Sequence, residues 1–112
     1  MQYTTNENST DIHSELIAKF FHGLSNPTRF KICLALLDGK KNVSELVEEL
    51  EVKQSQISNQ LVCLKWCGYV SAQKEGKFIY YQITDERVRQ MIELARQIVA
   101  DNAEHISCCT RM

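Results

Sequence analysis

The stretch VSELVEELEVKQSQISNQLVCLKWCGYV, residues 43–70, decides the fold of this chain. It contains two runs of apolar residues at helical spacing, each typical of a short amphipathic helix. The first run is Val43, Leu46, Val47 and Leu50, and the second is Ile57, Leu61 and Leu64. The second helix is expected to start near Ser55 and to end at Gly68, because glycine adopts the left-handed conformation of a helix end at little cost. Two helices joined by a short connection predict a helix-turn-helix.

A β-hairpin is expected directly after this motif. Its strands are Tyr69–Lys74 and Lys77–Ile83, and the Glu75-Gly76 pair between them has the composition of a turn. The second strand is rich in aromatic residues, which favours β-structure. A hairpin in this position is a wing, so the sequence predicts a winged helix-turn-helix.

Two helices are predicted on the N-terminal side of the motif. Asp11 is placed to cap an amphipathic helix over Ile12–His22. The Asn26-Pro27 pair starts a core helix that runs to Gly39, because asparagine caps free N–H groups and proline loses nothing at the first helical position. The Lys40-Lys41-Asn42 segment is expected to form a turn.

A last helix is expected after a cap at Thr84 or Asp85. Its apolar stripe consists of Val88, Met91, Ile92, Ala95, Ile98 and Val99. The first and last helices carry more apolar surface than one small domain covers, so we expect them to join two copies into a homodimer. The predicted fold is therefore mainly α with a small β-hairpin: a flexible N-terminus at 1–10, one domain at 11–103 and a cysteine-containing tail at 104–112.

The composition of the 112 residues indicates one globular domain in the cytoplasm. Hydrophobic residues make up 44% and charged residues 24%, close to globular averages. No apolar run approaches the roughly 20 residues that cross a bilayer, and residues 1–10 lack the pattern of a secretory signal. Five cysteines in a reducing compartment are more typical of metal binding or redox chemistry than of disulfides.

Double-stranded operator DNA is the expected partner. Residues 52–81 hold four lysines and one acid, although the formal net charge of the chain is -1. The second helix of such a motif enters the major groove, where amides and hydroxyls read base edges. The candidate side chains are Gln54, Ser55, Gln56, Ser58, Asn59 and Gln60. Lys74 and Lys77 at the hairpin tip are expected to contact phosphate. The alternatives are an ordinary polar helix surface and a solvated turn.

Four cysteines are candidate metal ligands. Cys63 and Cys67 lie one helical turn apart, beside the apolar face of their helix and not within it, although a place in the core is the alternative. Cys108 and Cys109 in the tail offer a third thiolate. Three sulfurs without histidine favour a soft ion such as cadmium, lead, mercury or arsenite, and zinc stays open. Cys33 lies within an apolar run and is expected in the core.

Four segments resemble the ArsR/SmtB family of metal-sensing repressors: LSNPTRFKICLALLDG at 24–39, VSELVEEL at 43–50, QSQISNQLVCLKWCGYV at 54–70 and EGKFIYYQI at 75–83. The resemblance extends from about Leu16 to Ala100. Cysteines at 63 and 67 are similar to those of the CmtR-type cadmium and lead sensors. That similarity implies a third thiolate from the tail of the other subunit, for which Cys108 is a better match than Cys109, and it implies cadmium or lead as effector.

The chain also departs from other patterns of the family. Asn42-Val43-Ser44 stands where arsenite and some cadmium sensors carry Cys-Val-Cys. Residues 85–103 contain no histidine, unlike the last helix of the zinc sensors. The metal sites that these two patterns would form are therefore expected to be absent. Two further departures lie in the second helix of the motif, where Gln60 stands at a position that often holds histidine and Trp66 is unusual.

Two other functions compete with metal sensing. In a redox-sensing repressor of the same fold, peroxide, persulfide or an electrophile would oxidise the Cys108-Cys109 or Cys63-Cys67 pair. A thiol enzyme or a protein-interaction module belongs to a different class. No histidine or carboxylate is evidently placed to activate a cysteine, so we expect the chain not to be an enzyme.

Overall fold

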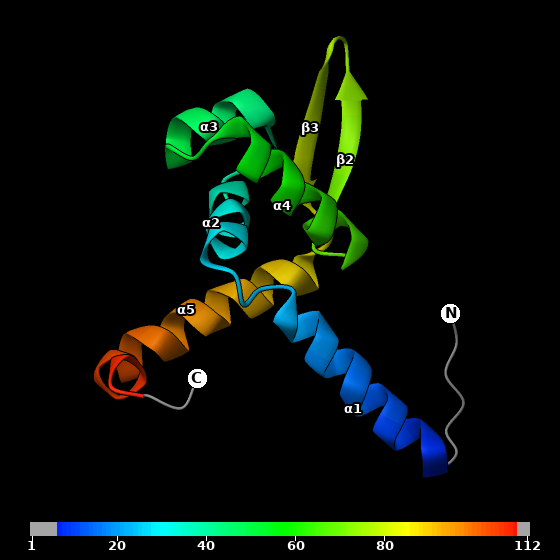
Figure 1. Ribbon diagram of the computed structural model, residues 1–112, viewed down its shortest axis with the longest axis vertical. Coiled ribbons are helices and arrows are strands. Elements are labelled where there is room, and N and C mark those ends of the chain that lie inside the picture. The colour runs from blue at the N-terminus through cyan, green and yellow to red at the C-terminus, as the bar shows by residue number, and fades with distance from the viewer. Residues whose placement is uncertain (1–6, 110–112) are drawn as a thin grey trace.

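A computed structural model describes residues 7–109 (Figure 1). Its elements are α1 (Glu7–His22), α2 (Pro27–Leu36), β1 (Lys41–Asn42), α3 (Val43–Leu50), α4 (Gln54–Trp66), β2 (Val70–Glu75), β3 (Phe78–Ile83) and α5 (Glu86–Ser107). Helices α3 and α4 form the helix-turn-helix, and β2 and β3 form the wing beside it (Figure 1). The predicted winged helix-turn-helix is confirmed. Across residues 7–109, no helix is both long and apolar enough to cross a membrane.

The core lies where α2, α3 and α4 meet the base of the hairpin and the start of α5. The side chains with almost no exposure are Ile32, Cys33, Leu36, Leu46, Ile57, Leu61, Leu64, Tyr69, Val70 and Ile92. They include the predicted apolar face of α4, which recurs every three or four residues and packs on α2 and α3. Because this face is buried, the opposite face of α4 remains available to a ligand.

The sheet has three strands in the order β1-β3-β2, all antiparallel. The predicted hairpin is confirmed, but its turn is Gly76-Lys77 and not Glu75-Gly76, because Glu75 pairs with Phe78 at the end of the ladder that starts with Val70 opposite Ile83. The prediction of a turn over Lys40-Lys41-Asn42 was wrong in part, since Lys41 and Asn42 form β1 opposite Tyr81 and Tyr80. The reason is long-range pairing, because a two-residue strand has no periodicity to detect and exists only through its neighbour.

Asn42 connects β1 to α3 through a capping box. Its side chain accepts a hydrogen bond from the Glu45 N–H at 2.9 Å, and its own N–H donates to Glu45 Oε1 at 2.9 Å. Asn42→Ala is expected to lower the free energy of unfolding by about 1 kcal/mol because the first turn of α3 loses its cap. Asn42→Asp, which keeps an acceptor, is the matched control in urea unfolding at fixed protein concentration. Equal losses in both variants would contradict this role.

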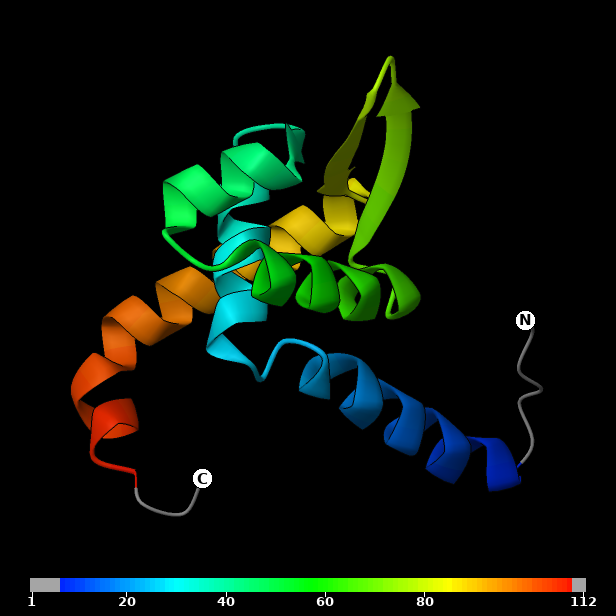
Figure 2. The same ribbon diagram turned by 45° about the horizontal axis from the view of Figure 1, so that its top comes forward.

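The terminal helices are longer than predicted. Helix α1 begins at Glu7 and not after a cap at Asp11, since no proline or glycine in that segment interrupts a helix. Helix α5 does start at Asp85, whose side chain accepts hydrogen bonds from the N–H groups of Arg87 and Val88. It continues through Ser107 with a kink at Asn102, so helical backbone crosses both predicted domain boundaries. Figure 2 shows α1 and the end of α5 extending from the body in different directions.

Candidate functional site

The N-terminal half of α4 presents the predicted DNA-reading side chains. Gln54, Ser55, Gln56 and Asn59 are exposed, and Ser58 and Gln60 are half-buried. The first turn of α4 contains no acid, and the cap residue Lys53 makes no side-chain hydrogen bond to it. No side-chain cap or acid of this turn therefore competes with a phosphate at the positive end of the helix dipole.

The wing adds exposed positive charge to this surface. Lys74 and Lys77 are both exposed at the tip of the hairpin, as predicted. The carboxylate of Glu75, between them, is paired with Lys40. Lys40 comes from the segment before β1, and its place beside the wing was not predicted because it depends on the pairing of β1 with β3. The acid of the wing is thus neutralised, and the lysines keep their charge.

Cys63 and Cys67 line one groove at the opposite end of α4. The groove has a volume of about 700 Å³, and Cys63 is exposed whereas Cys67 is half-buried. Its other lining residues are Leu16, Lys19, Phe20, His22, Gly23, Arg29, Val62 and Trp66. The expectation that both cysteines flank the core is met for Cys63, while Cys67 also packs against core side chains. Two thiols in one accessible groove fit a soft metal ion.

Cys67 touches the junction between α4 and α1. A Cβ atom on Gly23, at the end of α1, would lie 3.2 Å from Cys67 Sγ and 3.0 Å from the ring of Tyr69. Tyr69 stacks on Phe20 with ring centres 4.4 Å apart, and its hydroxyl donates to the Phe20 carbonyl. Burial raises the pKa of Tyr69 well above its ordinary value, with nearby Cys67 adding to the shift. A ligand on Cys67 therefore sits directly against the element that fixes α1.

This junction was not predicted from the sequence. Tyr69 and Phe20 are far apart in the chain, and no local pattern pairs them. The only sequence signal was Gly23, a residue without a side chain just after an amphipathic helix, which is consistent with close approach of another element.

The tail cysteines do not join Cys63 and Cys67 in this protomer. Cys108 and Cys109 are exposed beyond the end of α5. In both Figure 1 and Figure 2, that end lies away from the C-terminal end of α4. Within residues 7–109, no three histidine, cysteine, aspartate or glutamate side chains are grouped to hold a metal ion. The described part of one protomer therefore offers no third side chain of these types grouped with the pair on α4.

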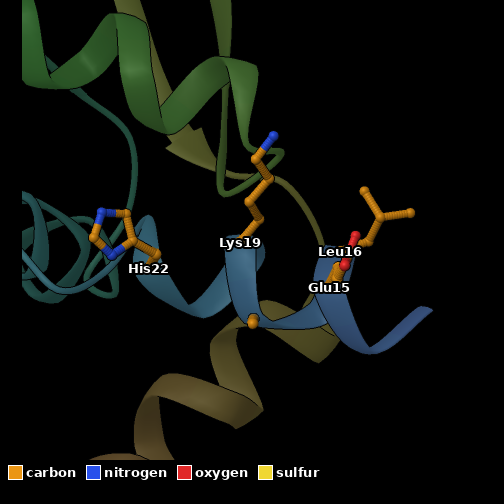
Figure 3. A pocket seen from close by; sticks show the side chains of 5 residues that line it. Glu15, Leu16, Lys19 and His22 are labelled. Atoms are coloured by element: carbon orange, nitrogen blue, oxygen red, sulfur yellow. The ribbon is translucent and has the colours of Figure 1, made fainter. Parts of the chain in front are cut away.

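Cys33 is not a ligand of this groove pair, and His22, although it lines the groove, is not grouped with Cys63 and Cys67 as a third ligand in the described part of the chain. Cys33 is completely buried, as predicted, and burial raises the pKa of its thiol to about 12, so it stays protonated. A second hollow, of about 620 Å³, lies along α1. Figure 3 shows Glu15, Leu16, Lys19 and His22 spread along that helix, with the Lys19 ammonium and the His22 ring pointing in different directions. No ligand set converges there.

Known proteins share this combination of motif and wing. Residues 26–72 match the family model of the bacterial regulatory proteins of the arsR family. The probable mercury resistance operon repressor of Streptomyces lividans is 42% identical over 100 residues, which are 89% of this chain and 80% of that protein. The HTH-type transcriptional regulator CmtR of Mycobacterium tuberculosis is 34% identical over 91 residues, or 80% of this chain and 77% of that protein.

A solved structure extends the likeness to nearly the whole chain. The homodimeric winged helix-turn-helix DNA-binding domain of a possible ArsR-family transcriptional regulator from Mycobacterium bovis superposes with a TM-score of 0.78 at 26% identity, covering 97% of this chain and 98% of that one. These relatives are transcriptional regulators and not enzymes, as expected from the sequence. With the motif, the wing and the relatives in agreement, this chain belongs to the ArsR family of bacterial transcriptional regulators.

Proposed function

We propose that this regulator binds operator DNA as a homodimer and releases it when a soft metal ion binds Cys63, Cys67 and a tail cysteine. One observation carries the proposal: a single helix, α4, has exposed amides at its start and two accessible thiols at its end. DNA and metal would thus act on the same rigid element. Its site of action would be the cytoplasm, where operator DNA lies.

We propose two kinds of contact between the protein and operator DNA. Gln54, Ser55, Gln56, Ser58, Asn59 and Gln60 would face base edges in the major groove. Glutamine and asparagine pair bidentately with adenine, so we expect adenines in the half-site. Lys74 and Lys77 of the wing would bind phosphate and fix the register of the helix.

The proposed homodimer is supported by apolar side chains that one protomer leaves exposed. They lie on the two terminal helices: Leu16, Ile17 and Phe21 of α1, and Leu94, Ile98, Val99 and Ile106 of α5. A set of this size on two helices favours an interface between copies. The dimer would place two α4 helices against an inverted repeat.

The proposed three-thiolate metal site requires a second copy of the chain. The end of α5 lies away from the C-terminal end of α4 in the same protomer, so the partner's tail is the source of the third thiolate that we propose, either Cys108 or Cys109. A divalent ion with three thiolates carries a net charge of -1. Lys19 and Arg29 in the groove wall supply the balancing positive charge.

Cadmium or lead is the effector that we propose, because three sulfur ligands suit these soft ions. Mercury is the leading alternative, since a relative is named as a mercury resistance repressor. Arsenite and zinc come after it, and zinc would take a fourth ligand.

Metal binding to Cys67 would change the packing of α1 through the neighbouring residues Gly23 and Tyr69. If the ion shifts this junction, the terminal helices and the spacing of the two α4 helices change together. Coupling between two ligands is reciprocal, so bound DNA must weaken metal binding by the factor by which metal weakens DNA binding. Such factors are about 5- to 150-fold in typical regulators.

The proposed binding of operator DNA is tested by selecting duplexes from a random-sequence pool with the reduced, metal-free protein. We expect an inverted repeat, and we expect Gln56→Ala to bind it about fivefold to 150-fold more weakly, as loss of one bidentate base contact implies. Lys31→Ala, an exposed change on α2, is the control. Selection of no common sequence would contradict operator binding.

A thiol redox sensor of the same fold remains the second candidate. Cys63, Cys108 and Cys109 are exposed, which is the condition for oxidation to sulfenic acid or a disulfide. This candidate predicts release of DNA by peroxide without metal, reversed by a dithiol reductant.

A further inference from the structure

The tip of the wing exposes two large apolar side chains. Phe78 opens β3 opposite Glu75, and Ile79 follows it opposite Lys74. Their side chains are 42% and 48% exposed. Single exposed apolar residues are common on proteins, but two at the end of a two-stranded ribbon have no core of their own to reach.

Phe78 belongs to a row of two neighbouring aromatic rings with a lysine beside each ring. Lys77 Nζ lies 5.4 Å from the centre of the Phe78 ring, and Lys40 Nζ lies 5.4 Å from that of Tyr80. The two rings meet edge to face with their centres 6.3 Å apart. This contact supports the Phe78 ring from the side of the sheet. The ring is therefore held in place at the tip, with positive charge on both sides of the row.

A second copy of the chain is not suited to cover this tip. Outside the hairpin, the exposed large apolar side chains lie on α1, on α5 and, with Val62 and Trp66, on the C-terminal part of α4. Both Figure 1 and Figure 2 show the hairpin tip at the end of the molecule away from α1 and α5. The tip instead carries exposed Lys74 and Lys77, while the Glu75 carboxylate is neutralised by Lys40. Exposed apolar side chains surrounded by positive charge suit a nucleic acid, because its phosphates are negative and the faces of its bases are apolar.

We propose that Phe78 is a wedge that enters the minor groove of the operator and bends the duplex. The inference rests on the proposed function and adds a specificity-determining residue to it. Apolar side chains inserted between base steps unstack them and kink DNA by about 20–90°. Because flexible pyrimidine–purine steps kink most easily, Phe78 would select sequence at positions that α4 does not touch.

The test measures bending and affinity on the duplex that the wild-type protein selects from a random-sequence pool. The duplex carries a fluorescence donor and acceptor at its two ends, so bending raises energy transfer. Phe78→Ala is expected to remove this rise and to weaken binding about tenfold, the equivalent of roughly 1.4 kcal/mol. Gln73→Ala shortens another exposed side chain of the same hairpin and is expected to leave both quantities unchanged.

Phe78→Lys separates a wedge from a purely electrostatic contact. A wedge predicts that this variant loses the bend although it gains a phosphate-binding charge. Wild-type bending by Phe78→Lys, or wild-type affinity and bending by Phe78→Ala, would overturn the wedge while leaving the repressor function intact. If the wild-type protein selects no duplex at all, the proposed function and the wedge fail together.

Discussion

Cys63→Ser and Cys67→Ser are each expected to leave DNA binding intact and to abolish its release by cadmium. Neither cysteine lies among the residues proposed to read DNA, because both line the groove at the other end of α4. Serine is similar in size but lacks the soft thiolate that the ion requires. In the wild type, cadmium should weaken DNA binding about 5- to 150-fold, and in each variant by less than about twofold. Fluorescence anisotropy of a labelled selected duplex measures both quantities.

Cys33→Ala is the control for the loss of a cysteine as such. Its thiol is completely buried and stays protonated, so the variant should keep the full cadmium response while losing some stability. Normal release of DNA from Cys63→Ser or Cys67→Ser would refute the assignment of the ligands.

Mixed dimers are expected to recover a metal site that neither parent possesses. One subunit carries Cys63→Ser and Cys67→Ser, and the other carries Cys108→Ser and Cys109→Ser. If the tail ligand comes from the partner, the mixed dimer has one complete site, formed by the helix thiols of one subunit and the tail of the other. If the ligand came from the same subunit, no complete site would form.

Co-expression with two affinity tags yields the mixed dimer, and thiolate-to-metal ultraviolet absorption counts its sites. We expect one tightly bound cadmium ion per mixed dimer, two per wild-type dimer, and loss of tight binding in each parent. Single Cys108→Ser and Cys109→Ser variants then identify the tail ligand. A mixed dimer without a tight site would contradict supply from the partner.

The centre of the fold could be predicted from the sequence because its signals are local. The apolar spacing of Ile57, Leu61 and Leu64 defined the buried face of α4, and Gly68 marked its end with a φ of 87°. The Asn26-Pro27 start of α2 and the Asp85 cap of α5 were readable for the same reason. Each of these features depends on residues within a few positions of one another.

The features that could not be predicted depend on residues distant in the chain. Strand β1 exists through pairing with Tyr80 and Tyr81, and Lys40 reaches the wing only because of that pairing. The contact of Cys67 with Gly23 and the stacking of Tyr69 on Phe20 likewise need the folded chain. For the metal site, the sequence named four candidate thiols, and the described part of one protomer does not group three of them.

The central claim is that thiolate capture on α4 and release of DNA are one event. Anaerobic titration of the reduced protein with cadmium tests it most directly, with thiolate-to-metal absorption and the anisotropy of a labelled operator duplex recorded in the same cuvette. We expect absorption to saturate at one ion per subunit and anisotropy to fall in step with it. Absorption without loss of anisotropy, or release only after peroxide is added, would contradict it.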